Sequence, residues 1–314
     1  MKLKGLLKMQ IKIAFGNMWG GFFPHDNIIT NSLKMSHDVI VDNVNPDVVI
    51  CQHTEGMPAK YVTERFKGRA KIIHWYVEAA NRIGEPDYND CDYSITTCTF
   101  DNEKNLRLPH WSMYIDWFND PYVADRNQSF LMCPEKLTSS YRKSIEKRKF
   151  CCILTNNDMG LRGSHYPQFI RLAQEDGLEV ESRGKFCRTF PPLQDSRCEL
   201  FKMSFIKDFK FHMCYENADV PGYVTEKIIH PMFDGVIPVY WGTEDVKKEF
   251  NPDRFVYAGD YSSVEEVYQR VIDIHSNDKL FYEIQSQPRF INNEIPYWST
   301  PEYIMTILTR FLEA

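Results

Sequence analysis

Residues 209–242 read FKFHMCYENADVPGYVTEKIIHPMFDGVIPVYWG. Apolar and polar residues alternate over the first five positions, which predicts a half-buried strand. A Pro-Gly pair at 221–222 breaks this strand, and a helical pattern then runs from Tyr223 until Gly235 ends it. The apolar run at 236–241 predicts a second, buried strand. The order strand, turn, helix, strand is typical of an α/β protein.

The polar residues of this stretch gather where the first strand passes into the helix. Thr225, Glu226 and Lys227 occupy the first helical turn. The first N–H groups of a helix lack intrahelical partners, and the helix dipole favours anions there. A lysine adds a charge for phosphate, and a glutamate adds an acceptor for hydroxyl groups. The same residue types also suit an ordinary helix start, so their spacing alone does not name a reaction.

Three short motifs in this stretch carry a resemblance to a known family. They are YEN at 215–217, YVTEK at 223–227 and IPVYWG at 237–242. In this order they resemble the signature of the α1,3/4-fucosyltransferases, glycosyltransferase family 10, which transfer fucose from GDP-fucose. The continuation FNPDRF at 250–255 is similar to the bacterial members. The resemblance is strong over residues 200–260 and fainter upstream.

The resemblance implies an α/β fold of GT-B architecture, in which two Rossmann-like domains face each other across a cleft. We expect residues 1–145 to form an acceptor-binding domain and residues 146–300 to form the GDP-fucose-binding domain. The polar stretch 133–149 and the apolar run FCCILT at 150–155 favour a boundary at this position. We expect the final helix, 301–314, to pack back onto the N-terminal domain.

The resemblance also implies which side chains bind the donor. These are Asn156, Arg162, Arg188, Asn217, Tyr223, Glu226 and Lys227. Arg188 follows a glycine-containing turn, and Arg183 is the alternative arginine at this turn. A planar guanidinium can bind two phosphate oxygens at once, although a plain surface arginine would fit the same position.

Each donor-binding residue has an expected role. Arg188, Lys227 and the helix start after Tyr223 would stabilise the charge that develops on the GDP leaving group. Glu226 would accept the ribose hydroxyls, while Asn217 and Tyr223 would frame the sugar and the phosphates. Cationic side chains then take the role of a metal ion, so we expect neither a metal nor another cofactor.

The general base is expected after an aromatic strand at 70–77. Bacterial relatives carry a glutamate there, and Glu78 is the nearest match. Glu85 stays an alternative, because the family pattern reaches a proline sooner than this chain, which has Pro86. Either carboxylate would need to come within ~2.6–3.2 Å of the acceptor hydroxyl, directly or through one water. A solvated loop glutamate is the other interpretation of Glu78.

Composition limits the classes of function. The chain has 314 residues and a net charge of −6, which argues against a general nucleic-acid binder. No apolar run reaches the ~20 residues that span a bilayer, so we expect a cytoplasmic, bacterial-type protein with at most peripheral membrane association. Nine cysteines are scattered along the chain without metal-ligand spacing, which predicts reduced thiols.

The predicted reaction is an inverting transfer of L-fucose from GDP-β-L-fucose to the 3-hydroxyl of GlcNAc, or Glc, in an N-acetyllactosamine-type glycan. The product would be Lewis x-like. Two alternatives stay open: a GT-B transferase that uses another GDP-deoxysugar, and a non-catalytic carbohydrate-binding relative, which the 14% aromatic content also fits. The sequence leaves open the acceptor, the choice of 1,3 or 1,4 linkage and the oligomeric state.

Overall fold

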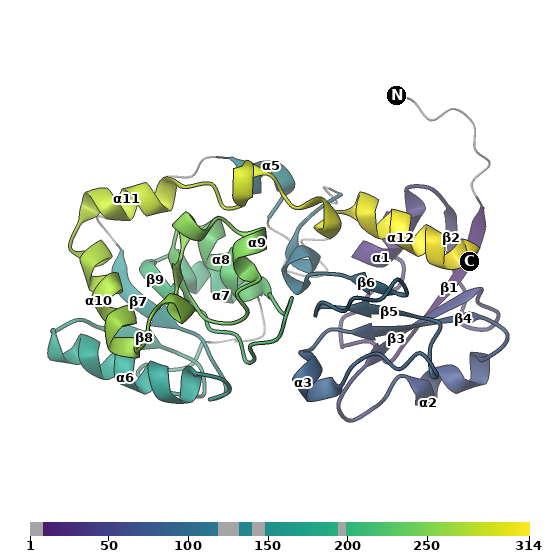
Figure 1. Ribbon diagram of the computed structural model, residues 1–314, viewed down its shortest axis with the longest axis horizontal. Helices are drawn as coiled ribbons and strands as arrows, with labels where there is room; N and C mark the ends of the chain where they lie inside the picture. Colours follow the sequence, from purple (N-terminus) through teal and green to yellow (C-terminus); the bar gives the residue numbers. More distant parts are fainter. Residues whose placement is uncertain (1–8, 119–131, 140–147, 194–198) are drawn as a thin grey trace. The chain divides into compact units, whose positions relative to one another are not determined.

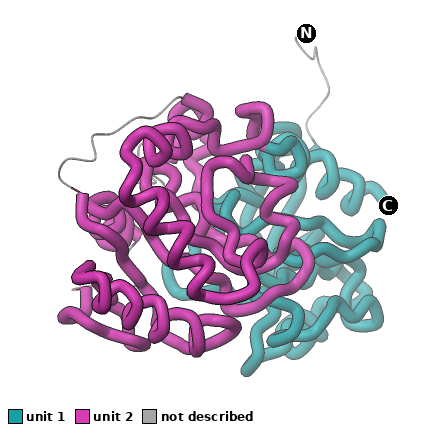
Figure 2. Tube along the Cα trace, turned by 60° about the vertical axis from the view of Figure 1, so that its left-hand side comes forward, with its two compact units in different colours: residues 1–113, 296–314 teal, residues 114–295 magenta. Residues whose placement is uncertain are grey.

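The computed structural model describes residues 9–118, 132–139, 148–193 and 199–314. Its contacts divide the chain into two compact units (Figure 2). The first unit runs to Met113 and also contains Pro296–Ala314, whereas the second is Tyr114–Ile295. Each unit is built on its own parallel sheet, and each is described here by itself.

The first unit contains a six-stranded sheet with the order β2-β1-β3-β4-β5-β6. Every pairing between these strands is parallel. Both faces of a parallel sheet are normally covered, which explains the nearly continuous burial of its central strands. The strands are β1 (Gln10–Gly16), β2 (Asp38–Val41), β3 (Val48–His53), β4 (Lys71–Tyr76), β5 (Tyr93–Thr96) and β6 (Asn105–Arg107).

Two helices that are far apart in the sequence cover one face of this sheet: α1 (Ile28–Lys34) and the last helix, α12 (Pro301–Glu313) (Figure 1). In α12 the buried residues Ile304, Leu308 and Phe311 recur at helical spacing, and they join the core made by the strands. The helix starts where the Thr300 hydroxyl accepts a bond from the Tyr303 N–H at 3.5 Å. The C-terminal helix is therefore part of the core of the first unit.

Shorter helical segments follow strands of the same unit. Phe66 packs on the opposite sheet face from α12, together with Ala14 and Val49. These segments are α2 (Lys60–Thr63), η1 (Glu64–Phe66), α3 (Ala80–Ile83), η2 (His110–Tyr114, whose last residue lies in the second unit) and η6 (Tyr297–Ser299).

The second unit contains a five-stranded parallel sheet with the order β11-β10-β9-β7-β8. Its strands are β7 (Lys149–Ile153), β8 (Val180–Ser182), β9 (Phe209–Met213), β10 (Ile237–Tyr240) and β11 (Val256–Tyr257). Because all strands run in the same direction, their carboxyl ends meet at one edge, where open α/β sheets bind ligands.

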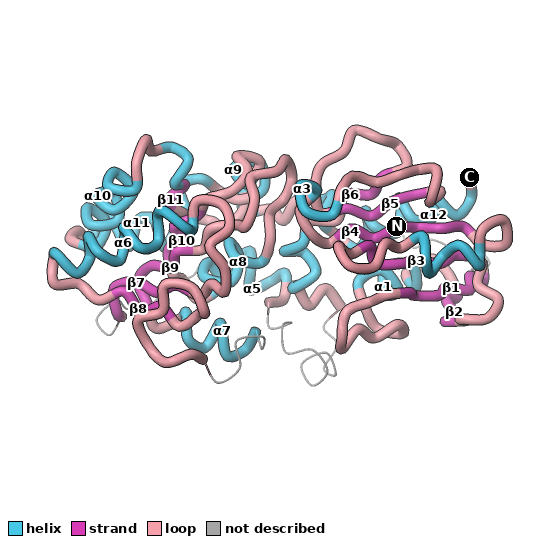
Figure 3. Tube along the Cα trace, turned by 90° about the horizontal axis from the view of Figure 1, so that it is seen from below, coloured by secondary structure: helices cyan, strands magenta, loops and turns pink. Residues whose placement is uncertain are grey.

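Helices cover this second sheet on both faces, as Figure 3 shows by the cyan segments around the magenta strands. One face carries α6 (Arg162–Glu175), α10 (Val264–His275) and α11 (Asp278–Ser286), which share one core with β7, β9 and β10. The other face carries α7 (Glu199–Ile206), whose Ile206 packs on Cys152 and Phe209. The remaining helices are α5 (Pro134–Thr138), α8 (Glu226–Phe233), α9 (Val246–Glu249), η3 (Pro252–Arg254), η4 (Ala258–Asp260) and η5 (Ile291–Asn293). In the parts of the chain that the structure describes, no helix is long and apolar enough to cross a bilayer.

The expected strand, turn, helix and strand of residues 209–242 are present as β9, α8 and β10. The helix begins at Glu226, three residues later than the pattern predicted. Gly222 has a φ of 77°, and Thr225 is extended with a φ of −112°. The Pro-Gly turn therefore reaches further along the chain than the apolar spacing suggests.

The division between the units lies at 113–114, upstream of the 145–146 boundary expected from the sequence. The Arg289 side chain ties the polar segment around α5 to the second unit. It donates to the carbonyl oxygens of Lys136 at 3.1 Å, Leu137 at 2.8 Å and Ser139 at 3.0 Å. A polar composition looks like a linker, but here its backbone is held by a buried guanidinium.

The packing of α12 gives a test of how the first unit is assembled. We expect Leu308→Ala to lower the free energy of unfolding by about 2–5 kcal/mol, because it leaves a cavity in the core. Urea titration measures the loss, and hydrogen exchange of the β1 and β3 amides assigns it to the first unit. The exposed Thr306→Ala is the control, expected to change stability by about 0.5 kcal/mol or less. An equal effect of both substitutions would contradict this role of α12.

Candidate functional site

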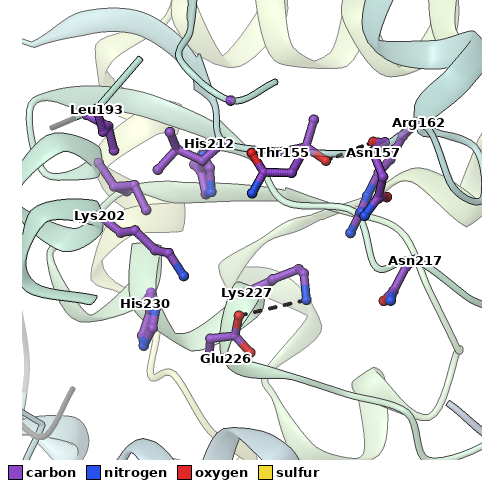
Figure 4. A pocket seen from close by; sticks show the side chains of 14 residues that line it. Thr155, Asn157, Arg162, Leu193, Lys202, His212, Asn217, Glu226, Lys227 and His230 are labelled. Atoms are coloured by element: carbon purple, nitrogen blue, oxygen red, sulfur yellow. Dashed lines mark hydrogen bonds and ion pairs between the residues drawn. The ribbon is translucent and has the colours of Figure 1, made fainter. Parts of the chain in front are cut away.

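A cavity of about 230 Å³ lies in the second unit (Figure 4). It is lined by residues that directly follow β7 and β9 and by residues of the first turns of α6 and α8. Five of the donor-binding residues predicted from the sequence line it, namely Asn156, Arg162, Asn217, Glu226 and Lys227. The cavity therefore brings together predicted residues that are up to 71 positions apart, since Asn156 follows β7 and Lys227 lies in the first turn of α8.

The start of α8 is held by a buried carboxylate, Glu216, which is fully inaccessible. Glu216 Oε1 accepts from the Thr225 N–H at 2.8 Å and from the Thr225 hydroxyl at 2.8 Å. The Tyr240 hydroxyl donates to the same oxygen at 3.2 Å. Because the Thr225 hydroxyl donates to Glu216, it does not cap α8: it accepts no hydrogen bond from the backbone N–H groups of the first turn. Glu216 thus fixes the N-terminus of α8 through Thr225, while the next two residues, Glu226 and Lys227, line the cavity.

Lys227 is the cation of this helix start. Its Nζ lies 3.0 Å from Glu216 Oε2 and 3.8 Å from Glu226 Oε1, and it donates to the Thr225 hydroxyl at 2.8 Å. Burial lowers the pKa of Lys227, but the carboxylates of Glu216 and Glu226 outweigh burial, so its pKa is raised. Lys227 therefore keeps its charge at neutral pH while its position is fixed by three partners.

Arg162 adds a second cation from the start of α6. Its side chain is 4% exposed, although it lines the cavity. Nε and Nη2 donate to the Tyr215 carbonyl oxygen at 3.1 and 2.5 Å, and Nη1 donates to Asn157 Oδ1 at 2.6 Å. All three contacts within the described residues go to neutral acceptors. The buried guanidinium thus has no carboxylate among its hydrogen-bond partners there.

Two further predicted residues shape the wall of the cavity. The Tyr223 hydroxyl donates to Asn217 Oδ1 at 3.1 Å, so the buried Tyr223 orients Asn217 without lining the cavity itself. Asn156 Oδ1 accepts from the Lys185 N–H at 3.2 Å and ties the loop after β8 to the loop after β7. Gly184 makes this approach possible, because a Cβ there would overlap the Thr155 carbonyl group.

The two arginines of the loop after β8, Arg183 and Arg188, do not line the cavity. Arg188 is exposed and is not among the residues that line the cavity. Arg183 forms an ion pair with Glu181, and its guanidinium lies 5.5 Å and 5.3 Å from the ring centres of Phe190 and Phe205. Arg183 thereby stabilises the loop after β8. The arginine that the fold brings to the cavity wall is Arg162.

Several lining residues were not singled out by the sequence: Thr155, Asn157, Gly184, Lys202, His212 and His230, with the apolar Leu154, Leu193 and Ile206. His212 alternates with buried residues of β9, so the period predicted a solvent-facing side chain, but helices on both faces of the sheet bury it. Lys202 belongs to α7, and nothing in the local sequence distinguishes it from a surface lysine. Glu216, the acidic residue of the YEN motif, was also not predicted as a site residue.

Both candidate bases belong to the first unit. Glu78 lies two residues after the end of β4, and its side chain is 42% exposed. Its Oε2 lies 3.4 Å from Arg82 Nη1, and Arg82 also pairs with Glu55 at 3.1 Å. Glu85 is exposed on the following loop. Glu78 thus occupies the carboxyl end of a central strand, while Glu85 lies beyond α3.

The role of Glu216 can be tested by stability. We expect Glu216→Gln to lower the free energy of unfolding by about 3 kcal/mol, because Lys227 loses its closest carboxylate. Tyr240→Phe removes a single hydrogen bond to the other carboxylate oxygen, Glu216 Oε1, and should cost about 1 kcal/mol. Guanidinium chloride titrations of both variants provide the measurement. If Glu216→Gln costs no more than Tyr240→Phe, the carboxylate does not hold the helix start.

The part of the chain that contains the cavity is similar to a known family. Residues 146–286 match the model described as "Glycosyltransferase family 10 (fucosyltransferase) C-term". The chain is 27% identical over 220 residues to "Alpha-(1,3)-fucosyltransferase FucT" of Helicobacter pylori, which covers 63% of this chain and 44% of that protein. It is 31% identical over 109 residues to "Alpha-(1,3)-fucosyltransferase B" of Drosophila melanogaster, which covers 34% of this chain and 24% of that protein. The chain thus spans less than half of the length of these curated relatives.

Solved structures agree on the fold. A crystal structure of an α1,3-fucosyltransferase superposes with a TM-score of 0.75 at 20% identity, covering 100% of this chain and 92% of that chain. A crystal structure described as α1,3-fucosyltransferase with GDP-fucose gives a TM-score of 0.72 at 20% identity, covering 100% and 94%. These similarities confirm the α/β class and the GT-B fold expected from the sequence. Residues 146–286, which contain the described cavity, are thus similar to the C-terminal part of glycosyltransferase family 10, the fucosyltransferases.

Proposed function

We propose that the protein is an inverting α1,3-fucosyltransferase that uses GDP-β-L-fucose. The observation that carries this proposal is the pair of fixed cations in one cavity, Lys227 and Arg162. A buried guanidinium with neutral partners is costly unless an anion compensates it. The diphosphate of a sugar nucleotide supplies such an anion, and a planar guanidinium can bind two of its oxygens. The match of residues 146–286 to the family 10 model and the GDP-fucose complex of a protein with this fold support GDP-fucose as the donor.

In the proposed reaction, the bond between the anomeric carbon of fucose and the β-phosphate oxygen breaks, and GDP leaves with the electron pair. The acceptor hydroxyl oxygen attacks the opposite face of the anomeric carbon, which inverts its configuration. Lys227, Arg162 and the N-terminus of α8 stabilise the negative charge that develops on GDP. Because Glu216 and Tyr215 already hold these cations, little reorganisation is needed during the reaction. Arg188 is exposed and stays a candidate contact for the donor.

We further propose roles for the remaining donor-binding residues and for the base. Glu226 accepts the ribose hydroxyls, while Asn217, oriented by Tyr223, contacts the sugar and phosphates, with Asn156 beside them. Glu78 takes the proton of the acceptor hydroxyl, and its ion pair with Arg82 orients the carboxylate.

For the acceptor we propose the 3-hydroxyl of GlcNAc, or Glc, in an N-acetyllactosamine-type glycan, with a Lewis x-like product. The names of the relatives state an α1,3 linkage, which supports the 3-hydroxyl as the attacking group. Since protein cations act on the leaving group, we also propose that turnover does not require a metal ion, and activity retained in EDTA would support this. Incubation with GDP-fucose, GDP-mannose and a glycan array, followed by linkage analysis, tests donor and acceptor together. Transfer from another GDP-sugar alone, or binding of glycans without transfer, would overturn the proposal.

Removal of the Lys227 charge tests the donor site. We expect Lys227→Met to weaken GDP binding and to reduce kcat/KM by about 10²–10³, because a preorganised donor at the leaving group is lost. Arg162→Met should also weaken GDP binding and reduce kcat/KM. Isothermal titration with GDP and a transfer assay measure both effects.

Two variants serve as comparisons for this test. Lys248→Met removes an exposed lysine outside the cavity and should leave both readouts unchanged. Arg188→Met separates the two candidate arginines, since it should have a smaller effect than Arg162→Met. Near-normal GDP affinity of Lys227→Met would contradict the assignment of the diphosphate site.

The base is tested by separating binding from chemistry. We expect Glu78→Gln to reduce transfer at least 10²-fold, the lower range for a general base, and to leave the affinity for GDP unchanged. Glu85→Gln should retain most of the activity. The reverse order of the two variants would assign the base to Glu85.

A further inference from the structure

The cavity has two chemically different ends. Figure 4 shows Asn157, Arg162 and Asn217 on one side of His212, and Leu193 and Lys202 on the other. The first end is polar and contains the buried guanidinium. The second end contains the apolar Leu193 and the ammonium group of Lys202, and Ile206, which belongs to the same helix as Lys202, also lines the cavity. This division matches the division within a nucleotide, which has a polyanion at one end and a flat base at the other.

Lys202 is held at the apolar end by a specific partner. Its Nζ lies 2.6 Å from Glu199 Oε1, and both residues are in α7. Glu199 Oε2 lies 3.4 Å from Nδ1 of His230, which also lines the cavity. An ammonium has three N–H donors, and within the described residues Glu199 accepts from one of them. The lysine therefore has a fixed direction and donor capacity toward the cavity.

His212 adds an uncharged aromatic ring next to this end. Its Nδ1 lies 3.1 Å from the Cys152 carbonyl oxygen and 3.3 Å from the Cys152 sulfur, and these contacts fix the ring. Burial lowers the pKa of His212 to about 4, and the ring is therefore neutral at pH 7. A neutral ring beside aliphatic side chains suits a heteroaromatic base rather than a phosphate group.

We propose that this end of the cavity binds the purine base of the nucleotide and that Lys202 determines specificity for guanine. In the proposal the Lys202 ammonium donates to the O6 and N7 atoms of guanine, while Glu199 positions the lysine. Adenine presents an amino group where guanine has O6, so a lysine on that edge favours guanine. The inference rests on the proposed use of GDP-fucose and adds the residue that distinguishes its base.

The test compares Lys202→Met with the wild type by isothermal titration of GDP, ADP and pyrophosphate. We expect the wild type to prefer GDP over ADP. Lys202→Met should lose about 10–100-fold in affinity for GDP and little for ADP or pyrophosphate. Lys202→Arg should retain the preference, since a guanidinium also donates to O6 and N7. The control is Lys207→Met, which alters a nearby lysine outside the cavity lining and should bind all three ligands like the wild type.

The outcomes separate this inference from the proposed function. Equal weakening of GDP, ADP and pyrophosphate by Lys202→Met would show a phosphate contact and overturn the base assignment. An unchanged ratio of GDP to ADP affinity in Lys202→Met would also overturn it. If the wild type binds no GDP, the proposed function itself fails. A thermal melt of each variant, with Lys202→Arg as the folded reference, shows whether a lost affinity reflects lost structure.

Discussion

The buried carboxylate of Glu216 is the interaction on which the candidate site depends. It joins the segment that follows β9, to which it belongs, with the residue before α8 and with β10, because Thr225 and Tyr240 both donate to its Oε1. Such a carboxylate is costly to bury unless its oxygens are fully bonded. The surrounding chain leaves it room only because residue 242 is glycine, since a Cβ there would lie 2.9 Å from Glu216 Cγ. The position of the α8 N-terminus is therefore set by the fold and needs no ligand.

This arrangement explains why the two cations of the cavity differ. Lys227 forms ion pairs with Glu216 and Glu226, so these carboxylates already neutralise part of its positive charge when no ligand is bound. Arg162 is more deeply buried, and its described partners are the neutral Tyr215 carbonyl and Asn157 side chain. Arg162 therefore gains more than Lys227 when an anion binds. In the proposed reaction, Lys227 fixes the geometry of the helix start, and Arg162 supplies the larger share of uncompensated charge.

The sequence predicted the elements that depend on local pattern and missed those that depend on distant contacts. The period of 209–242 was sufficient to locate β9, α8 and β10, and the first-turn residues Glu226 and Lys227 do line the cavity. Arg162 and Arg188 were both expected to bind the donor, with Arg183 as the alternative to Arg188, and local pattern did not show which of them lines the cavity. Arg162 reaches the cavity wall because the Tyr215 carbonyl, 53 residues away, holds its side chain, whereas Arg188 lies on an exposed loop. Spacing within one segment contains no information about such a partner.

The same distinction applies to the acidic residues, and it bears on the proposed mechanism. Glu216 is fully buried and accepts from donors of two other segments, so it serves as a fixed part of the scaffold. Glu78 is partly exposed and shares Arg82 with Glu55, so a water or a substrate hydroxyl can reach its carboxylate. A general base has to accept a proton during each turnover, which requires access and a carboxylate whose other contacts are weak enough to change. A scaffold carboxylate requires the opposite, because its protonation would release Lys227 and loosen the start of α8. Burial, rather than residue type, therefore decides which glutamate can take part in proton transfer and which one can only hold the site.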